Sequence, residues 1–560
     1  MSTHTNPDNT PNTNPTPVPS GENASVPQAR PKPPKQVYPL ERRDWIFAAI
    51  LPFCTLFTVI AGVWGGFQAG FTAAYLVIFA LFTAYLARRG AKAGAYAAVC
   101  GVLAVLLSAV YTITSGTAIR FFALCLMAVL SVVWFSSLAG KRMFPGELGL
   151  AKRVLWQTGF MIERTPRSVA SLFGTKNPHA KKAAKALLGL LCAAPVLGVV
   201  IALLIRSDAA FEGLMGRMFS NVGVTIVQII LTLILFPFLL SFGFSTRKDA
   251  DEAQKEKTRK GLDTLFIAAF LGVLAVCYLV YLVSQLAYFF SAFSGILPEG
   301  FSFSYAEYAR RGFFELCGIA GINLALLYLM LLLSKKTDGK PPVVLRVLGV
   351  FIDLFTLLLI CTAEAKMVLY IRAYGVTVKR LGTSAFMLLM AVVFLAMLLR
   401  FFVSRVRVLP VAVVTAAVIV LVLGAGNMHT FAARYNYNAY KSGTLSTVDT
   451  AYLRKLGDEG IPYLAELTKD GNAEIRRQAY AQLCIAVEER YEGEYEFVPK
   501  GQVDTSYFSP AEKSAGKLTQ FSIPRRRAYA ALDALLQEQP DFLRTYAADR
   551  DAAMGEEFFW

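Results

Sequence analysis

Eleven stretches of this chain are apolar over the length that a helix needs to cross a membrane. The hydrocarbon layer is about 30 Å thick, so a helix that rises 1.5 Å per residue spans it with roughly 20 apolar residues. We therefore predict an all-α polytopic helical membrane bundle of about eleven transmembrane helices. The predicted spans are residues 45–64, 68–87, 93–114, 119–138, 186–205, 222–243, 262–288, 313–333, 344–368, 382–401 and 409–426.

The composition agrees with a membrane protein and argues against nucleic acid as a partner. Only 17% of the 560 residues are charged, against about a quarter in ordinary soluble domains. The net charge of +17 does not come from a soluble basic segment interleaved with stacking aromatic side chains, the pattern typical of nucleic-acid binding. We therefore use the positive charges to predict the membrane topology.

Lys and Arg residues fall on one side of the membrane if the predicted spans alternate in direction. Short loops rich in these residues are retained in the cytoplasm. An odd number of spans then places the N-terminus in the cytoplasm and the C-terminus on the extracytoplasmic side of the membrane. The residues that set this orientation are Arg42, Arg43, Arg88, Arg89, Lys92, Lys255, Lys257, Arg259, Lys260, Lys335, Lys336, Arg400, Arg405 and Arg407, with those of 141–185.

Three regions follow from the pattern. Residues 1–40 are rich in Pro, Asn and Thr and have no hydrophobic period, so we expect a disordered cytoplasmic tail. Residues 41–426 form the multispan domain. Residues 427–560 are hydrophilic and predict an extracytoplasmic α-helical module, with helices at 430–441, 447–456, 459–468, 472–490 and 523–538.

The basic cytoplasmic loop 141–185 is long enough to form structure of its own. It mixes Leu and Trp side chains with ten Lys or Arg residues. This mixture favours an interfacial helix on a bilayer with anionic lipids in its inner leaflet. An ordinary basic loop that serves only topology is an equal alternative.

The stretch FSYAEYARRGFFEL at 303–316 places arginines on the outer side, where they are disfavoured. As a helix it would set Glu307, Arg311 and Glu315 at four-residue spacing, with Arg310 three residues after Glu307. We expect structural ion pairs at the membrane surface. The alternative is an outward site for an anionic head group or phosphate.

Asp353 and Glu364 are acidic residues inside the predicted ninth span. An acid near the midplane costs about 2.5–3.5 kcal/mol to insert, so it is expected to face the bundle interior. Two interpretations stay open: a proton or substrate path, and a buried polar clamp that fixes helix register. The neighbouring spans offer Asn323, Tyr278, Tyr281, Gln285 and Tyr288 as partners.

No catalytic, cofactor-binding or metal-binding set is predicted. Most cysteines lie inside apolar runs, and the three histidines are scattered. Asp249 and Asp251 have a spacing that some sugar-nucleotide enzymes use for a divalent metal, but their loop of alternating charge is more typical of a solvated turn.

Three segments carry a resemblance to a known family: SYAEYARRGFFEL, residues 367–395, and residues 427–467. They resemble the bacterial membrane family known as domain of unknown function 4173, with its relative 4153. The resemblance implies a multispan bacterial protein and supplies no activity. In the third segment the residues at matching places are Asn427, Arg434, Tyr435, Asn436, Tyr452, Leu453 and Pro462.

These observations favour a non-catalytic envelope protein for interaction or sensing, with an envelope protein or polymer as the partner of its outer module. A secondary transporter that uses Asp353 and Glu364 is the first alternative. A membrane-bound transferase that uses the acids of 249–252 is the second.

Overall fold

The computed structural model describes residues 37–87, 93–141, 146–173, 222–249, 262–294, 313–336, 340–491, 521–539 and 541–557 of the chain. These ranges are helical and contain no β-strand. The predicted all-α class is therefore confirmed. The expected tail at 1–40 lies outside the described residues except for its last four.

Ten helical segments in the described ranges are long and apolar enough to cross a membrane. They coincide with ten of the eleven predicted spans, and the other one, 186–205, lies outside the described residues. The segments are α1 (Arg42–Phe57) with η1 (Thr58–Val63), α2 (Ala69–Leu86), α3 (Ala95–Ser108) with α4 (Val110–Ile113), α5 (Thr117–Leu138), α10 (Val222–Lys248), α11 (Thr264–Ser294), α13 (Phe313–Leu333), α14 (Val343–Tyr374), α15 (Val378–Phe402) and α16 (Val408–Ala425).

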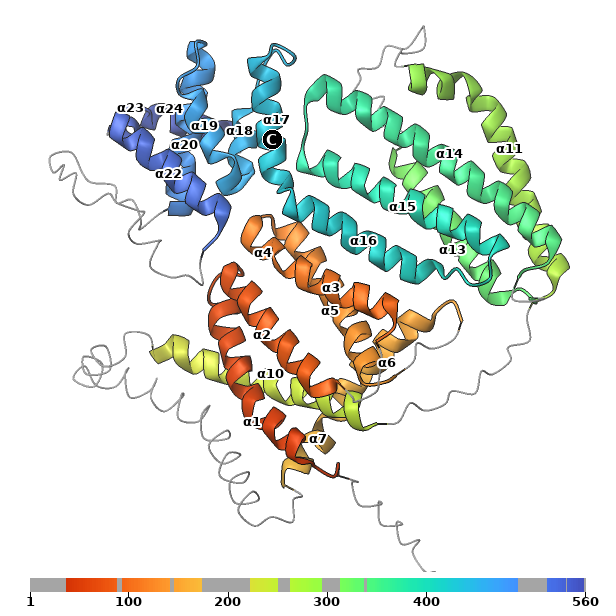
Figure 1. The fold of residues 1–560 in the computed structure, drawn as a ribbon. Helices are drawn as coiled ribbons and strands as arrows, with labels where there is room; N and C mark the ends of the chain where they lie inside the picture. Colours follow the sequence, from red (N-terminus) through yellow and green to blue (C-terminus); the bar gives the residue numbers. More distant parts are fainter. Residues whose placement is uncertain are drawn as a thin grey trace, which may run out of the picture.

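The spanning helices form two groups that α16 joins (Figure 1). The first group is α1–α5 with α10, and its core includes Phe47, which stacks on Tyr85 and meets Phe82 edge-on. The second group is α11, α13, α14 and α15, with a core that includes Phe394 and Phe401. Helix α16 packs against α15 on one side and against α3 and α5 on the other.

The two ends of the bundle carry different elements. At the end where α1 begins, Lys248 of α10 pairs with Asp44 of α1 at 2.6 Å, and we call this the α1 end. Helix α10 therefore runs opposite to α1, and it contacts η1 as well.

Two short helices, α6 (Gly149–Glu163) and α7 (Thr165–Phe173), lie at the α1 end and pack on α10. They occupy the first part of the predicted basic loop. Polar residues of α6, Arg153 and Gln157, are buried against the protein, whereas Leu155 and Ile162 are 71% and 63% exposed. Helix α6 thus turns apolar side chains away from the protein.

The C-terminal module lies at the opposite end of the bundle, which we call the module end (Figure 1, blue). Its helices share one core that includes Leu453, Leu464, Leu483 and Leu532 and also Val376 from the turn between α14 and α15. All five predicted helices are present, and two short helices at the C-terminus were not predicted. The elements are α17 (Met428–Lys441), α18 (Thr450–Lys455), η2 (Gly457–Glu459), α19 (Ile461–Leu467), α20 (Ala473–Tyr491), α22 (Ile523–Glu538), α23 (Phe542–Thr545) and α24 (Ala547–Glu557).

Candidate functional site

The C-terminal module is held to the membrane bundle by a buried carboxylate. Glu459 of η2 is buried, and it receives the backbone N–H of Ser115 at 2.9 Å and the Ser115 hydroxyl. Longer contacts of 3.4 Å come from Thr114 Oγ1 and Asn427 Nδ2. Ser115 lies in the turn between α4 and α5, so one side chain of the module fixes a turn of the bundle.

Asn427 connects the same carboxylate to the start of the module. It stands at the junction of α16 and α17 with φ of 44°, a left-handed conformation that Asn tolerates better than most residues. Its Oδ1 accepts from Thr430 N at 3.1 Å and so caps α17, while its Nδ2 donates to Ile113 O at 2.9 Å. We call Glu459, Ser115, Asn427 and His429 the module junction.

His429 packs against the turn at Gly116. A Cβ placed on Gly116 would lie 2.2 Å from His429 Cε1, so only glycine admits the imidazole here. Burial holds the pKa of His429 below its usual value, Glu459 offsets part of that shift, and Arg120 adds to it. The imidazole is therefore neutral at pH 7.

A second contact fixes the turn between α14 and α15. Asn436 of α17 makes a paired interaction with Val376: its Oδ1 accepts from the backbone N–H and its Nδ2 donates to the carbonyl, both at 2.8 Å. Gly375 precedes this pair with φ of 76°, and a Cβ there would lie 2.5 Å from Asn436 Oδ1. Tyr452 of α18 accepts the N–H of Val378 at 2.7 Å. The module thus holds two separate turns of the bundle.

Most of the stretch 303–316, in which ion pairs were predicted, lies outside the described residues. Glu307, Arg310 and Arg311 lie outside the described residues, and Glu315 is in α13 without a described side chain. Among the residues singled out by resemblance, Asn436 lies in the second contact, whereas Arg434 is exposed on α17.

Asp353 lies within the second helix group. It is completely buried, and neither of its carboxylate oxygens has a hydrogen-bond partner among the described residues. Two of the expected partners bond elsewhere: Tyr278 OH donates to Asn323 Oδ1 at 2.6 Å, and Asn323 Nδ2 donates to Thr356 Oγ1 at 2.8 Å. The side chains of Gln285 and Tyr288 lie outside the described residues. The sequence pattern indicated these polar residues, but it did not show that Tyr278 and Asn323 bond directly to each other or that Thr356 is the second partner of Asn323.

Glu364 does not share the surroundings of Asp353. Eleven residues of helix separate the two by about 16 Å along α14. Glu364 lines a groove of about 540 Å³ between α14, α15 and α16, with Ser384 as a second polar side chain and apolar residues elsewhere. The structure therefore does not bring Asp353 and Glu364 together.

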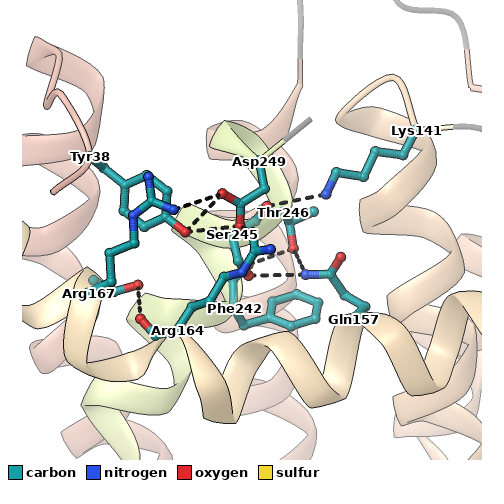
Figure 2. A network of polar contacts seen from close by, with 10 residues as sticks. Tyr38, Lys141, Gln157, Arg164, Arg167, Phe242, Ser245, Thr246 and Asp249 are labelled. Atoms are coloured by element: carbon teal, nitrogen blue, oxygen red, sulfur yellow. Dashed lines mark hydrogen bonds and ion pairs between the residues drawn. The ribbon is translucent and has the colours of Figure 1, made fainter. Parts of the chain in front are cut away.

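A third polar network lies at the α1 end and includes Asp249, one of the two acids considered for a metal (Figure 2). The Asp249 carboxylate accepts from Tyr38 OH at 2.9 and 3.1 Å and forms ion pairs with Arg164 and, at 3.7 Å, Arg167. These contacts fasten α6 and α7 to the end of α10. Asp251 lies outside the described residues.

A fourth contact joins the two helix groups at the α1 end. Glu147, before α6, is buried and pairs with Arg400 of α15 at 2.6 Å and with Lys336 at 3.4 Å. Tyr328 of α13 donates to the Glu147 carbonyl at 2.8 Å. No cluster of three or more His, Cys, Asp or Glu side chains suited to a metal ion occurs in the part of the chain that the structure describes.

One family model matches the chain, over residues 101–467, and its description is domain of unknown function (DUF4153). The chain belongs to this family. The predicted relationship was to family 4173, and what is shown instead is its relative, 4153. No curated protein matches the chain, and no solved structure does.

The matched segment of this DUF4153 protein contains the contacts made by Glu459 and Asn436, whereas the backbone hydrogen bond from Ala69 N to Phe521 O, at 3.2 Å, lies outside it. It runs from α3 to α19 and so includes Ser115, Asn427, Asn436 and Glu459. Helices α20, α22 and α24 lie beyond it. The DUF4153 protein is a multi-pass membrane protein with ten apolar spans in its described part.

The part of the module beyond the match helps to form a surface pocket. The pocket measures about 270 Å³ and lies between α18, α20 and α24. Its polar lining is Asp449, Thr450, Glu474, Arg477, Gln478, Gln482 and Asp549. It is open to solvent and carries charges of both signs.

Proposed function

We propose that this protein is a non-catalytic interaction or sensing protein of the bacterial envelope. Its α1 end faces the cytoplasm, and its C-terminal module faces outward from the cell membrane. The Lys and Arg residues of α1, α6 and α7 at the α1 end support this orientation, because positive loops are retained inside. The exposed Leu155 and Ile162 of α6 support contact with the inner leaflet and its anionic lipids.

The module junction carries the proposal. A receptor domain on a flexible tether would not need buried polar contacts with the helices that anchor it. Here Glu459 and Asn436 each hold a different turn of the bundle, at 2.9 Å from Ser115 N and 2.8 Å from Val376 N. A partner bound to the module is therefore coupled to α4–α5 and to α14–α15.

The pocket between α18, α20 and α24 is the surface that we assign to the partner. Its rim combines the Arg477 guanidinium with the Asp549 carboxylate, 3.7 Å apart, and with the amide of Gln478. Such a set of donors and acceptors suits a polar segment of an envelope protein or polymer better than an apolar ligand.

Site-specific photo-crosslinking in intact cells tests this assignment. A benzophenone amino acid at Gln478, on the pocket rim, is expected to give a discrete adduct whose partner mass spectrometry identifies. The matched control position is Glu538 on α22, which is exposed and lies outside the pocket lining. It is expected to give no such adduct.

Reversing the charge of Arg477 tests whether the partner is recognised by the pocket or is only close to it by chance. Arg477→Glu is expected to abolish the Gln478 adduct while membrane insertion stays normal. Adducts of equal yield from Gln478 and Glu538, or an adduct that persists in Arg477→Glu, would contradict the assignment of the pocket.

Transport is the second candidate function, because Asp353 is fully buried with two oxygens that lack hydrogen-bond partners in the described chain. Such a residue inside a membrane marks an ion path in many proteins. Asp353→Asn keeps the shape of the side chain and removes the charge. Loss of a proton or cation flux in vesicles, with normal expression, would support transport, and an unchanged flux would exclude this role for Asp353.

A further inference from the structure

The first turn of α22 lies at the membrane boundary on the module side. The backbone carbonyl of Phe521, two residues before this helix, accepts the N–H of Ala69 at 3.2 Å, and Ala69 is the first residue of the spanning helix α2. Helix α22 begins at Ile523 and leads away from the bundle (Figure 1). Arg527 follows four residues later, so it lies about 6 Å along the helix axis from Ile523. The head-group layer is about 5–8 Å deep on each side of the bilayer, and this first turn falls within it.

Large apolar side chains are exposed around this contact. Phe521 and Ile523 are each 38% exposed, and Phe67, two residues before Ala69, is also exposed. Trp64, which follows η1, is exposed as well. Aromatic side chains at this depth suit the layer between the head groups and the hydrocarbon. The face of the module beside the start of α2 therefore meets lipid.

Three exposed arginines lie on the two module helices that begin at this boundary. Arg526 and Arg527 are in the first turns of α22, and Arg434 is on α17, which begins just beyond the spanning helix α16. None of their guanidinium groups forms a hydrogen bond or an ion pair within the described ranges. Their N–H donors are therefore available to an anion from outside the protein.

Tyr463 brings the arginines of the two helices together. It is on α19, which packs against both α17 and α22. Its ring centroid is 5.6 Å from that of Tyr437, which lies one turn after Arg434 on α17. Burial raises the pKa of Tyr463, and the guanidiniums of Arg434 and Arg527 oppose this rise because both lie near its hydroxyl. Two guanidiniums from different helices and one hydroxyl form a set of donors that suits a phosphate.

We propose that this arginine cluster, made of Arg434, Arg526, Arg527 and Tyr463, binds the phosphate of an anionic phospholipid in the leaflet on the module side. The bilayer is the partner because the cluster begins at the end of a spanning helix, beside aromatic side chains that are exposed at the level of the lipid. Three cations without acidic partners favour a lipid of net negative charge over a zwitterionic one. The bound lipid fastens the first turn of α22 to the membrane surface. This proposal depends neither on the partner of the module nor on the side of the membrane that the module faces.

Photo-crosslinking of the full chain in lipid nanodiscs tests the site. A benzophenone amino acid at Ile523 is exposed to equal amounts of phosphatidylglycerol and phosphatidylcholine, and mass spectrometry counts the adducts of each lipid. We expect phosphatidylglycerol adducts to exceed phosphatidylcholine adducts by about tenfold or more, the effect of several arginines near an anionic lipid. The control position is Glu538, which is exposed and lies about 22 Å farther along α22. It is expected to give no lipid adduct, and adducts equal to those from Ile523 would overturn the placement of the first turn at the membrane.

Single substitutions test whether the two helices act together. Arg434→Gln and Arg527→Gln are each expected to lower the preference for phosphatidylglycerol about three- to fivefold, the effect of one arginine near an anionic surface. Lys379→Gln, which removes an exposed positive charge at the same end of the bundle, is the matched control and is expected to keep the wild-type preference. Equal adducts of the two lipids in the wild type, or an equal loss of preference in Lys379→Gln, would overturn the site. Loss of the preference when inorganic phosphate is added at constant ionic strength would assign the cluster to a soluble anion and overturn the bilayer as its partner.

Discussion

Removing the carboxylate of Glu459 is expected to loosen the module from the bundle. In Glu459→Ala, the partly buried N–H of Ser115 loses its acceptor at 2.9 Å and the Ser115 hydroxyl loses its partner. A buried hydrogen bond to a charged group contributes about 1.5–3 kcal/mol, and the longer contacts add less. We expect a cost of about 3 kcal/mol, which favours local opening by roughly 150-fold.

Glu459→Gln is expected to loosen the module less than Glu459→Ala does. The amide keeps one acceptor for Ser115 N, so the expected cost is about 1 kcal/mol, or roughly fivefold in opening. Hydrogen exchange of the amides of α17 and of the α4–α5 turn, measured in nanodiscs, reports the opening directly. Glu474→Ala, whose side chain is 55% exposed and pairs at the surface, is the control and is expected to exchange as wild type. Wild-type exchange in both Glu459 variants would refute the role of this carboxylate.

Three further changes probe other parts of the structure. Gly375→Ala forces a Cβ to within 2.5 Å of Asn436 Oδ1 at a φ of 76°, so we expect a loss of about 1–3 kcal/mol, read as a lower midpoint of thermal unfolding; an unchanged midpoint contradicts the clamp. Because the pKa of His429 is held below its usual 6.5, the opened junction takes up a proton first as pH falls below 6.5, so protection of α17 should decrease toward pH 5 and stay constant above pH 7. His429→Gln should remove this pH dependence of protection. If the pH dependence persists in the variant, it arises from another titrating group. Asp249→Asn removes the ion pairs that hold α7, and trypsin should then cleave after Arg167 faster than in wild type, whereas equal rates would show that packing alone holds the helix.

The spanning helices could be predicted because their cause is local. Each one is a run of apolar residues whose length matches the bilayer, and no knowledge of neighbouring helices is needed to recognise it. The structure bears this out in α15, where the uncharged segment 381–399 lies between two arginines. The amphipathic character of the basic loop was likewise visible in its mixture of Leu, Trp and Arg.

The contacts between module and bundle could not be predicted, because they join residues far apart in sequence. Glu459 and Ser115 are 344 positions apart, and in sequence Glu459 belongs to an unremarkable Gly-Asp-Glu-Gly turn. Resemblance marked Asn436, but nothing local identified Val376 as its partner. Helix α24 was missed because its apolar residues are only Ala and Met554, and it is joined to α20 by the ion pair between Arg550 and Glu488, at 3.3 Å.

The placement of the two bundle ends on opposite sides of the membrane is the claim on which the proposed function depends most. Single cysteines at Arg43, which is exposed at the α1 end, and at Ser442, which is exposed on the module, would test it in a chain whose other cysteines are replaced by serine. A membrane-impermeant maleimide applied to intact cells is expected to label the cysteine at 442 and to reach the one at 43 only after permeabilisation. Labelling of both positions from the same side, or of position 43 alone in intact cells, would contradict the account.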